Sequence, residues 1–499
     1  MASAAPLWFD NGTFIDPNIN DLSHHVELED LDGDGDVDII FVNNTAEYAG
    51  NPGSAQLNRV YLNDGGIFTD DGGSTFQIPD NARVVKTGDV NGDGNVDIVA
   101  GACWSGDSYI LFGSGGGTFI EGGSLPTGIT VGDFDLGDFD NDGDLDIVAS
   151  DYGSLSDLGA VDDVGAVLQL WENDGSGNFS NTNMFAGTYH VAYSKKVSFV
   201  DVDNDFDFDV VAASHGGGTD IMDFDAFPQN RVFINDNNVF TELPQDAFSQ
   251  LRVCTNITMV DFNDDLYLDM FTLQDGGGFG DPARRDRVIL NDPNNGGTFT
   301  TSPDWLTAMN STQALHRIGQ LIDFNHDRRP DLVVAGLDNP NDNFTLLRHD
   351  GAELVIDEPP FDVPGLNHIS SSAIADLDGD YIDDIVLAQH NSFNNNYVLN
   401  GTDDLGADAG APVIGVWEQL GSAMVGETVH IRARIHDNKN PTKPHDWLLE
   451  NGERVMPYVE YVLNLPDEPT VEEFNTLSDN SETTRIATVW TGEYMHRGS

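Results

Sequence analysis

One acidic segment of nine residues recurs seven times in this chain. Its clearest copy reads Asp30-Leu-Asp-Gly-Asp-Gly-Asp-Val-Asp38, and the other copies begin at Asp89, Asp138, Asp201, Asp261, Asp323 and Asp376. Side-chain oxygens stand at positions one, three, five and nine of the segment, with a tight turn between them. A hard cation such as Ca2+ takes about six to eight oxygen ligands in proteins. The spacing therefore predicts calcium-binding loops.

Short apolar runs follow these loops, for example at residues 98–100, 147–149 and 210–212. They are β-branched and quickly interrupted, which is typical of buried strands rather than helices. A second phrase recurs at residues 60–68, 232–240 and 288–299. There an apolar strand, an Asn/Asp/Gly turn and a Phe-bearing return strand predict a β-hairpin. Each repeat is thus expected to contain four strands, A to D, with the acidic loop between A and B.

The repeats predict the fold class. Successive acidic segments begin 59, 49, 63, 60, 62 and 53 residues apart. Four-stranded antiparallel units repeated seven times are typical of a seven-bladed β-propeller, whereas a solenoid has shorter and denser repeats. The last repeat lacks a Phe-bearing return strand. Residues near Thr13 and Phe14 are expected to supply that outer strand and so to close the ring.

The chain is expected to be all-β with two domains. The propeller is predicted to span residues 1–405. Residues 402–412 are rich in Asp, Gly and Ala, as in a linker. Beyond them, alternating segments at 413–419, 428–436, 458–465 and 485–490 predict a small immunoglobulin-like β-sandwich over 411–499. This second domain is expected to be incomplete at its end.

The composition is strongly acidic. Of 499 residues, 85 are Asp or Glu and 21 are Lys or Arg, a formal charge of −64 that seven divalent ions would reduce to about −50. Such a negative field disfavours nucleic acid and anionic membranes as partners, and it is best tolerated in salty or calcium-rich water. With two cysteines there is no disulfide framework, and no apolar run is long enough to span a membrane.

The two recurring phrases, Asp-x-Asp-x-Asp-Gly-x-x-Asp-Ile and Val-Tyr-Leu-Asn-x-Gly-x-Phe, resemble the FG-GAP/VCBS repeat family. This family includes the seven-bladed propeller of integrin α subunits and many secreted bacterial proteins. The resemblance covers roughly residues 1–405. It implies structural Ca2+ in up to seven A–B loops, a secreted or cell-surface location, and frequently a role in adhesion or carbohydrate binding. If the protein is exported, its sequence is expected to begin near the mature end, because the start lacks signal-peptide features.

Carried onto this sequence, the resemblance implies metal ligands in every loop. In loops one to three these are Asp30, Asp32, Asp34, Asp36 and Asp38; Asp89, Asn91, Asp93, Asn95 and Asp97; and Asp138, Asp140, Asp142, Asp144 and Asp146. In loops four to seven they are Asp201, Asp203, Asp205, Asp207 and Asp209; Asp261, Asn263, Asp265 and Asp269; Asp323, Asn325, Asp327 and Asp331; and Asp376, Asp378, Asp380 and Asp384.

Position six divides the loops into two groups. Loops one to three have Gly35, Gly94 and Gly143 there, where a left-handed backbone is expected. Loops four to seven depart from the pattern and have Phe206, Leu266, Arg328 and Tyr381. Weaker or absent metal is the alternative for these four loops.

Basic and imidazole side chains gather at the opposite end of the predicted propeller. Antiparallel strands place the A–B loops and C–D turns at one end, and the B–C and D–A loops at the other. The candidate ligand-binding residues in the latter loops are His24, Arg83, His190, His215, Arg252, His316, Arg317, His368 and His390. Together they would hold a carboxylated or sulfated ligand through charge-assisted hydrogen bonds. A transition-metal site and simple local packing of the histidines are the alternatives.

The sequence therefore favours a recognition or adhesion module whose partner is an acidic polysaccharide or another cell-surface component. The alternative is a polysaccharide lyase acting on a uronate polymer, with His190 or His316 beside Tyr189 or Arg317 as acid, base and charge-neutralising groups. A third reading is a surface scaffold. No unique catalytic set stands out, so the sequence leaves open whether the protein is an enzyme.

Overall fold

The computed structural model describes part of the chain, and every structural statement below concerns that part. The described residues are 13–15, 21–44, 56–77, 80–103, 107–126, 128–151, 168–185, 194–205, 207–214, 230–243, 254–263, 265, 267–274, 286–292, 298–301, 316–322, 329–336, 344–351, 353–356, 369–379, 382–390 and 396–402, together with the backbone of five later strands.

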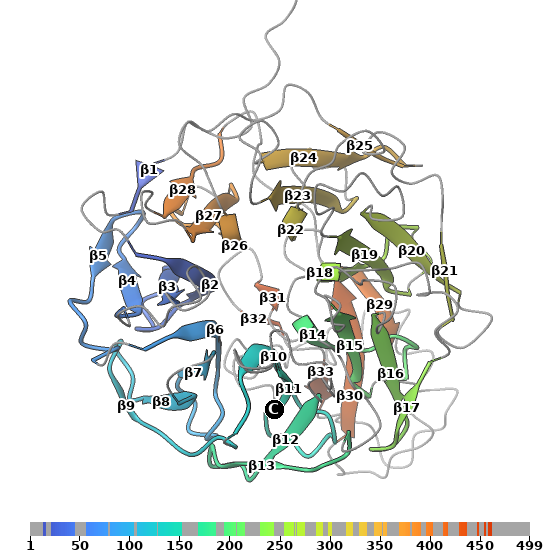
Figure 1. Cartoon of the computed structure of the whole chain (residues 1–499), viewed down its shortest axis with the longest axis horizontal. Coiled ribbons are helices and arrows are strands. Elements are labelled where there is room, and N and C mark those ends of the chain that lie inside the picture. Colours follow the sequence, from blue (N-terminus) through green and yellow to red (C-terminus); the bar gives the residue numbers. More distant parts are fainter. Residues whose placement is uncertain are drawn as a thin grey trace, which may run out of the picture.

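Seven four-stranded antiparallel sheets surround a common centre (Figure 1). Blade one contains β2 (Ser23–Glu29), β3 (Asp38–Asn43), β4 (Arg59–Asn63) and β5 (Phe68–Asp70). Blade two contains β6 (Ala82–Gly88), β7 (Asp97–Ala102), β8 (Tyr109–Gly113) and β9 (Phe119–Glu121). Blade three contains β10 (Val131–Gly137), β11 (Asp146–Asp151), β12 (Gln169–Asn173) and β13 (Phe179–Asn181). Blade four contains β14 (Ser194–Val200), β15 (Asp209–Ser214), β16 (Arg231–Asn235) and β17 (Phe240–Glu242).

The remaining blades follow the same order. Blade five contains β18 (Cys254–Val260), β19 (Asp269–Gln274), β20 (Arg287–Asp292) and β21 (Thr298–Thr301). Blade six contains β22 (His316–Ile322), β23 (Asp331–Gly336), β24 (Phe344–His349) and β25 (Leu354–Ile356). Blade seven contains β26 (Ile369–Ala375), β27 (Asp384–Gln389) and β28 (Tyr397–Leu399), and its fourth strand is β1 (Thr13–Phe14). The prediction of a seven-bladed propeller is confirmed.

Strand B is buried on both faces in every blade where its side chains are described. In β3, for example, Ile39, Ile40, Phe41 and Val42 are all shielded from water. A short continuous apolar run has this property because each sheet packs against a neighbour on both sides. The result is one apolar core at each of the seven joints between blades.

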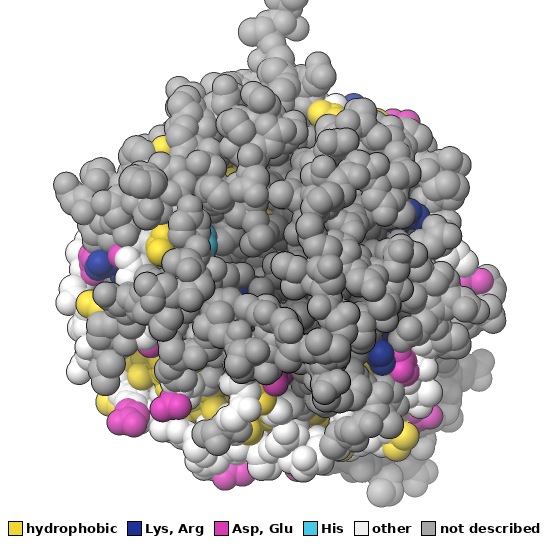
Figure 2. Space-filling model, viewed as in Figure 1, with side chains coloured by type: hydrophobic (Ala, Val, Ile, Leu, Met, Phe, Trp, Pro, Cys, Tyr) yellow, Lys and Arg dark blue, Asp and Glu magenta, His cyan; other side chains and the backbone are white. Residues whose placement is uncertain are grey.

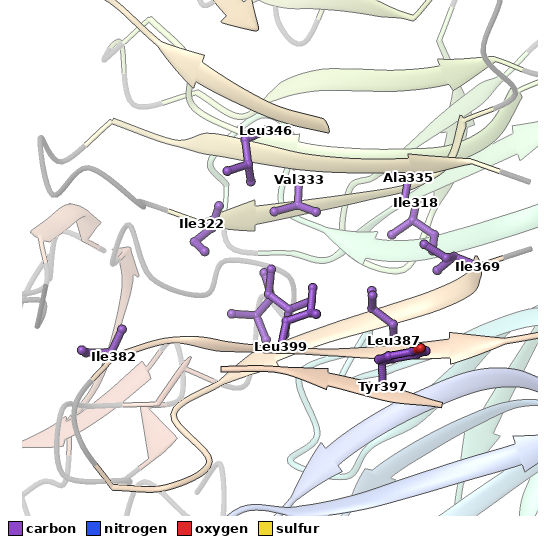
Figure 3. Close-up of a cluster of buried hydrophobic side chains, with 12 residues drawn as sticks. Ile318, Ile322, Val333, Ala335, Leu346, Ile369, Ile382, Leu387, Tyr397 and Leu399 are labelled. Atoms are coloured by element: carbon purple, nitrogen blue, oxygen red, sulfur yellow. The ribbon is translucent and has the colours of Figure 1, made fainter. Parts of the chain in front are cut away.

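The core between blades six and seven illustrates this packing (Figure 3). Val333 and Leu346 of blade six lie opposite Leu387 and Leu399 of blade seven. Burying aliphatic side chains of this size contributes roughly 1.5–3 kcal/mol each. The blades are therefore held to one another mainly by apolar contacts, and the loops at either end are free to carry polar groups.

The ring closes as the sequence predicts. Thr13 pairs with Val398 and Phe14 pairs with Tyr397, so β1 forms the outer edge of blade seven. A further backbone bond runs from the N–H of Ile15 to the carbonyl of Asn396 at 3.3 Å. A sheet built from both ends of the repeat region closes the circle with strand pairing, in addition to the apolar core of that joint.

Five strands follow the propeller. β29 (Val413–Trp417), β30 (Val429–His436) and β33 (Tyr458–Tyr461) form one antiparallel sheet, and β31 (Trp447–Leu448) pairs with β32 (Arg454–Val455). The immunoglobulin-like sandwich over 411–499 and the domain boundary remain predictions. No helix in the described part of the chain could cross a membrane.

Candidate metal centre and the opposite face

The first aspartate of each acidic loop organises the turn. In loop one, Asp30 Oδ1 accepts a hydrogen bond from the Gly33 N–H at 2.7 Å and Oδ2 accepts one from the Gly35 N–H at 3.2 Å. Gly35 has a φ of 101°, and its counterparts Gly94 and Gly143 have 89° and 100°. The expected left-handed backbone at position six is confirmed in loops one to three.

The last aspartate of each loop begins strand B and is buried. In loop one, Asp38 Oδ2 accepts from the Leu31 N–H and Oδ1 accepts from the Asn63 N–H, both at 2.8 Å. The same two bonds, from position two of the loop and from the end of strand C, recur at Asp97, Asp146, Asp209, Asp269 and Asp384. Position nine therefore ties each loop to the body of its blade.

Three carboxylates converge in four of the loops. The oxygens of the aspartates at positions one, three and nine lie within 4.8 Å of one another in loops one, three, four and seven: Asp30, Asp32 and Asp38; Asp138, Asp140 and Asp146; Asp201, Asp203 and Asp209; Asp376, Asp378 and Asp384. Loops four and seven are among them although they lack glycine at position six. Loops two and five have Asn91 and Asn263 at position three, where an amide oxygen replaces a carboxylate.

The electrostatics of these sites favour a cation. Burial, together with the negative charges of the aspartates at positions one and three, raises the pKa of Asp38 to about 7 and that of Asp146 to about 9. Asp140 Oδ1 and Asp203 Oδ1 are buried oxygens that accept no hydrogen bond. A divalent cation would favour the ionised carboxylates and give these oxygens a partner. The all-oxygen donor set thus fits Ca2+.

The other predicted ligands have different surroundings. The position-five residues Asp34, Asp93 and Asp142 are exposed and lie outside the triads. At position seven, Asp36 Oδ2 accepts from the Gly65 N–H at 2.8 Å and so holds the C–D turn. The predicted ligands Asp323, Asn325, Asp327 and Asp380 lie outside the described residues.

Adjacent loops and turns share one end of the propeller, as predicted. Asp207 of loop four accepts at Oδ2 from the N–H of Asn237 in its own C–D turn at 3.1 Å. Its Oδ1 accepts from Asn141 Nδ2 of loop three at 2.8 Å. The neighbouring acidic loops three and four are therefore in direct contact. This end of the molecule gathers acidic side chains from the loops and turns together.

The basic face brings together three of the predicted ligand-binding residues. His24 Nδ1 lies 3.0 Å from the Arg83 carbonyl, and the rings of His24 and His390 meet edge to face at 5.6 Å. His390 Nε2 lies 2.7 Å from the Asn44 carbonyl, and Arg83 Nε donates to the Gly132 carbonyl at 2.8 Å. Arg83 is 4% exposed and His390 is 8% exposed. These side chains join neighbouring blades at this end.

The structure places the remaining members of that set only in part. The backbone places His316 and Arg317 at the start of β22. The other four lie outside the described residues: His190, His215, Arg252 and His368.

A β-bulge occurs at one register in all seven inner strands. In every blade, two residues of strand A that are separated by one extra residue pair with consecutive residues of strand B. The extra residue forms the bulge. The seven extra residues are His24, Arg83, Gly132, Lys195, Thr255, Arg317 and Ser370. Bulges re-aim side chains and are frequent near functional sites. None of the seven is acidic.

Ion pairs lie next to this register on the inner strands of blades two to four. Lys86 Nζ is 3.6 Å from Asp135, and Lys196 Nζ is 3.5 Å from Asp133. Burial alone lowers the pKa of Lys196, but Asp133 and Asp135 raise it more, so the ammonium stays charged. Asp133 and Asp135 also accept backbone N–H groups of β14. These pairs were not predicted from the sequence, although the period-two spacing of Asp133 and Asp135 signals them.

Charged side chains also line the outside of the ring. On the face seen in Figure 2, Asp and Glu lie around the outer edge, and Lys or Arg lie near some of them. Arg59 pairs with Asp70 and Arg231 pairs with Glu242, both at 3.0 Å. These pairs join strands C and D within one blade, so they belong to the scaffold.

Comparisons with known proteins agree with the repeats. The family model of the FG-GAP-like repeat matches residues 30–100 and 89–149. No curated protein matches. A lectin structure from Agrocybe aegerita, described as recognising non-reducing terminal N-acetylglucosamine, is 16% identical, covering 67% of this chain and 80% of that chain with a TM-score of 0.41. Two structures of BBS1N in complex with ARL6DN are each 10% identical. The match covers 79% of this chain and 97% of the BBS1N structure's chain, with a TM-score of 0.43. The chain thus contains FG-GAP-like repeats and folds as a seven-bladed β-propeller.

Proposed function

We propose that this protein is a calcium-stabilised recognition module that works outside the cell. Calcium in the acidic loops would neutralise carboxylates that burial otherwise drives toward protonation. The converging triads and the buried unpaired oxygens of Asp140 and Asp203 support this role. The ions would be structural, because the position-nine ligands are also the groups that tie each loop to its blade.

The ligand that this proposal favours is an acidic glycan or a comparable acidic cell-surface component. One observation carries this choice: seven bulges stand at one register, and their residues include His24, Arg83, Lys195 and Arg317 but no carboxylate. In a chain of charge −64 such a ring is a distinct local environment. Cationic side chains at this register would hold carboxylate or sulfate groups through charge-assisted hydrogen bonds.

His24 and Arg83 take part in contacts between blades, so they would shape the opening of this site. Lys195 and Arg317 occupy the same bulge position in blades four and six, so these two residues are the ones to substitute. We expect wild-type protein to bind sulfated or carboxylated polysaccharides more tightly than neutral ones. We also expect binding to weaken steeply with salt, since ionic contacts are screened.

The test is a glycan panel measured with wild type, Lys195→Gln, Arg317→Gln and a charge-matched control, Arg231→Gln, in strand C of blade four. The first two variants should lose about tenfold or more of the affinity for acidic polymers, and the control should lose little. Equal binding by all four proteins, or binding to neutral glycans alone, would contradict the proposal. Ultraviolet-absorbing products in the same incubations would identify the lyase alternative instead.

A further inference from the structure

Four blades carry an asparagine at the end of strand C, next to the acidic loops. Asn235 of blade four shows its contacts most fully. Its backbone N–H donates to Asp209 Oδ1 at 2.7 Å. Its side-chain Nδ2 donates to the Phe208 carbonyl at 3.2 Å and to the Phe139 carbonyl at 2.9 Å. Phe208 and Asp209 are positions eight and nine of loop four, whereas Phe139 is position two of loop three.

The joint between blades seven and one has the same arrangement. The Asn63 N–H donates to Asp38 Oδ1 at 2.8 Å, and Nδ2 donates to the Val37 carbonyl at 3.0 Å. The same Nδ2 donates to the Leu377 carbonyl, position two of loop seven, at 2.7 Å. This contact therefore joins the first and last blades of the ring, because it connects a strand of blade one to a loop of blade seven.

Two more joints repeat it. Asn173 Nδ2 donates to its own loop at Leu145 (3.0 Å) and to position two of loop two at Val90 (2.8 Å). Asn291 of blade five donates to its own loop at 3.3 Å and to Val202, position two of loop four, at 2.8 Å. All four asparagines are at most 5% exposed. A carboxamide has two N–H donors, and in each case both are used on loop carbonyls.

Blade two contacts the corresponding position-two carbonyl of its preceding blade through a different residue. Its strand C ends in Gly113, where a Cβ would lie 2.1 Å from the Val96 carbonyl oxygen, so no asparagine fits. Instead the N–H of Gly117, in the C–D turn, donates to the Leu31 carbonyl at 3.2 Å. Leu31 is position two of loop one. The position-two carbonyl is therefore held by the next blade even where the asparagine is missing.

Position two lies between two of the candidate ligands on the chain, and its own N–H donates to the position-nine carboxylate. Fixing both polar groups of this residue fixes the carboxylates on either side of it. We propose that each strand-C asparagine is a positioning residue for two cation sites at once, its own blade's and that of the preceding blade. This inference rests on the proposed binding of calcium by the loops.

The expected loss of calcium affinity on removing such an asparagine can be taken from other metal sites. Groups that orient metal ligands typically contribute about 10–100-fold to metal affinity. Removal of the Asn235 carboxamide should therefore weaken loops three and four together and leave loops one and seven unchanged. Removal of the Asn63 carboxamide should do the reverse. A residue that merely supported the fold would not select two adjacent sites.

The experiment is a calcium titration by calorimetry of wild type, Asn235→Ala and Asn63→Ala. Asp140→Asn and Asp203→Asn variants identify the heat of loops three and four. The matched control is Asn237→Gly, because exposed Asn237 stands two residues away at a φ of 50° and its backbone bond to Asp207 survives. Asn235→Ala should lower affinity at loops three and four by about tenfold or more. The control should bind as wild type does.

A second readout separates positioning from folding. The melting temperature of each variant is measured in excess calcium and in excess chelator. The stabilisation by calcium, the difference between the two, should shrink in Asn235→Ala. Two results would overturn the inference. One is an Asn235→Ala variant that binds calcium at loops three and four as tightly as wild type does. The other is an Asn235→Ala melting temperature that is lowered by the same amount in calcium and in chelator. Wild type that takes up no cation would instead contradict the proposed calcium sites. If Asn235→Ala does not fold, Asn63→Ala at loops one and seven decides in the same way.

Discussion

The carboxylate of Asp146 and the backbone N–H of Asn173 lie 2.8 Å apart, although 27 residues separate them in the sequence. Through this bond the last residue of loop three is attached to the end of strand C. The other oxygen of Asp146 accepts from Phe139 in its own loop at 3.3 Å. The same carboxylate also points into the candidate cation site with Asp138 and Asp140. Cation binding and blade architecture are thus joined in one side chain.

Asp146→Asn should destabilise the calcium-loaded protein. The new amide nitrogen would face a backbone N–H, and leaving a buried donor without an acceptor costs about 1–3 kcal/mol. Asp142→Asn, at exposed position five of the same loop, should change stability by much less. Chemical denaturation in calcium measures both. Equal free energies of unfolding for the two variants would contradict the structural role of position nine.

Stability without calcium should fall as pH rises. Burial raises the folded-state pKa of Asp97 to about 7 and of Asp384 to about 8, above an ordinary value near 3.8. For an acid with a raised pKa the folded state holds the proton more tightly. Its stabilising contribution is therefore full below about pH 4 and is lost progressively up to about pH 7–8.

Calcium should reduce this loss, because it binds the ionised carboxylates. Melting temperatures at pH 5.5, 7 and 8.5, in chelator and in calcium, measure the effect. We expect a steep decline in chelator and a shallower one in calcium. Parallel curves in the two conditions would show that the position-nine carboxylates do not respond to the cation.

The inner ion pair of Lys196 and Asp133 should matter more than an outer one. Removing one partner of a largely buried pair leaves the other charge without compensation, at a cost of about 3–5 kcal/mol when burial is complete. Lys196 is partly accessible, so we expect about 1–3 kcal/mol for Lys196→Met. Arg231→Met leaves behind Glu242, whose side chain is 22% exposed against 8% for Asp133, so it should cost under about 1 kcal/mol. Denaturant unfolding of both variants compares them, and the reverse ranking would refute the assignment.

Ring closure makes the first strand part of the last blade. Removing residues 1–15 eliminates the pairing of β1 with β28, whereas removing residues 1–12 retains Thr13 and Phe14. We expect the longer deletion to lower the melting temperature by several degrees more than the shorter one. Similar melting temperatures would mean that the apolar core of this joint holds blade seven without β1.

Much of this architecture can be predicted from the sequence because the same pattern recurs in seven repeats. The Asp spacing predicts the loops, and the apolar runs after them predict strand B. The closing role of Thr13 and Phe14 follows from a missing return strand. Glycine at position six predicts the left-handed turn, but loops four and seven form the triad without it, since their position-one and position-nine bonds suffice.

Other features depend on contacts between repeats, which no single repeat reveals. The Asn in Val-Tyr-Leu-Asn signals a hairpin when read locally, yet Asn63 binds a loop that begins 313 residues later, at Asp376. Arg83 resembles a ligand-binding cation by type, but it is buried against the Gly132 carbonyl. The bulges at one register are equally hidden, because they arise from the pairing of two strands and not from a residue pattern.

The most direct measurement is a crystal structure of the protein grown in calcium, with anomalous scattering recorded to locate the ions. We expect one anomalous peak between Asp138, Asp140 and Asp146 and another between Asp201, Asp203 and Asp209. Each ion would be bound by the oxygens that converge within 4.8 Å in this structure. Well-defined loops with no anomalous peak at either triad, in crystals saturated with calcium, would contradict this expectation.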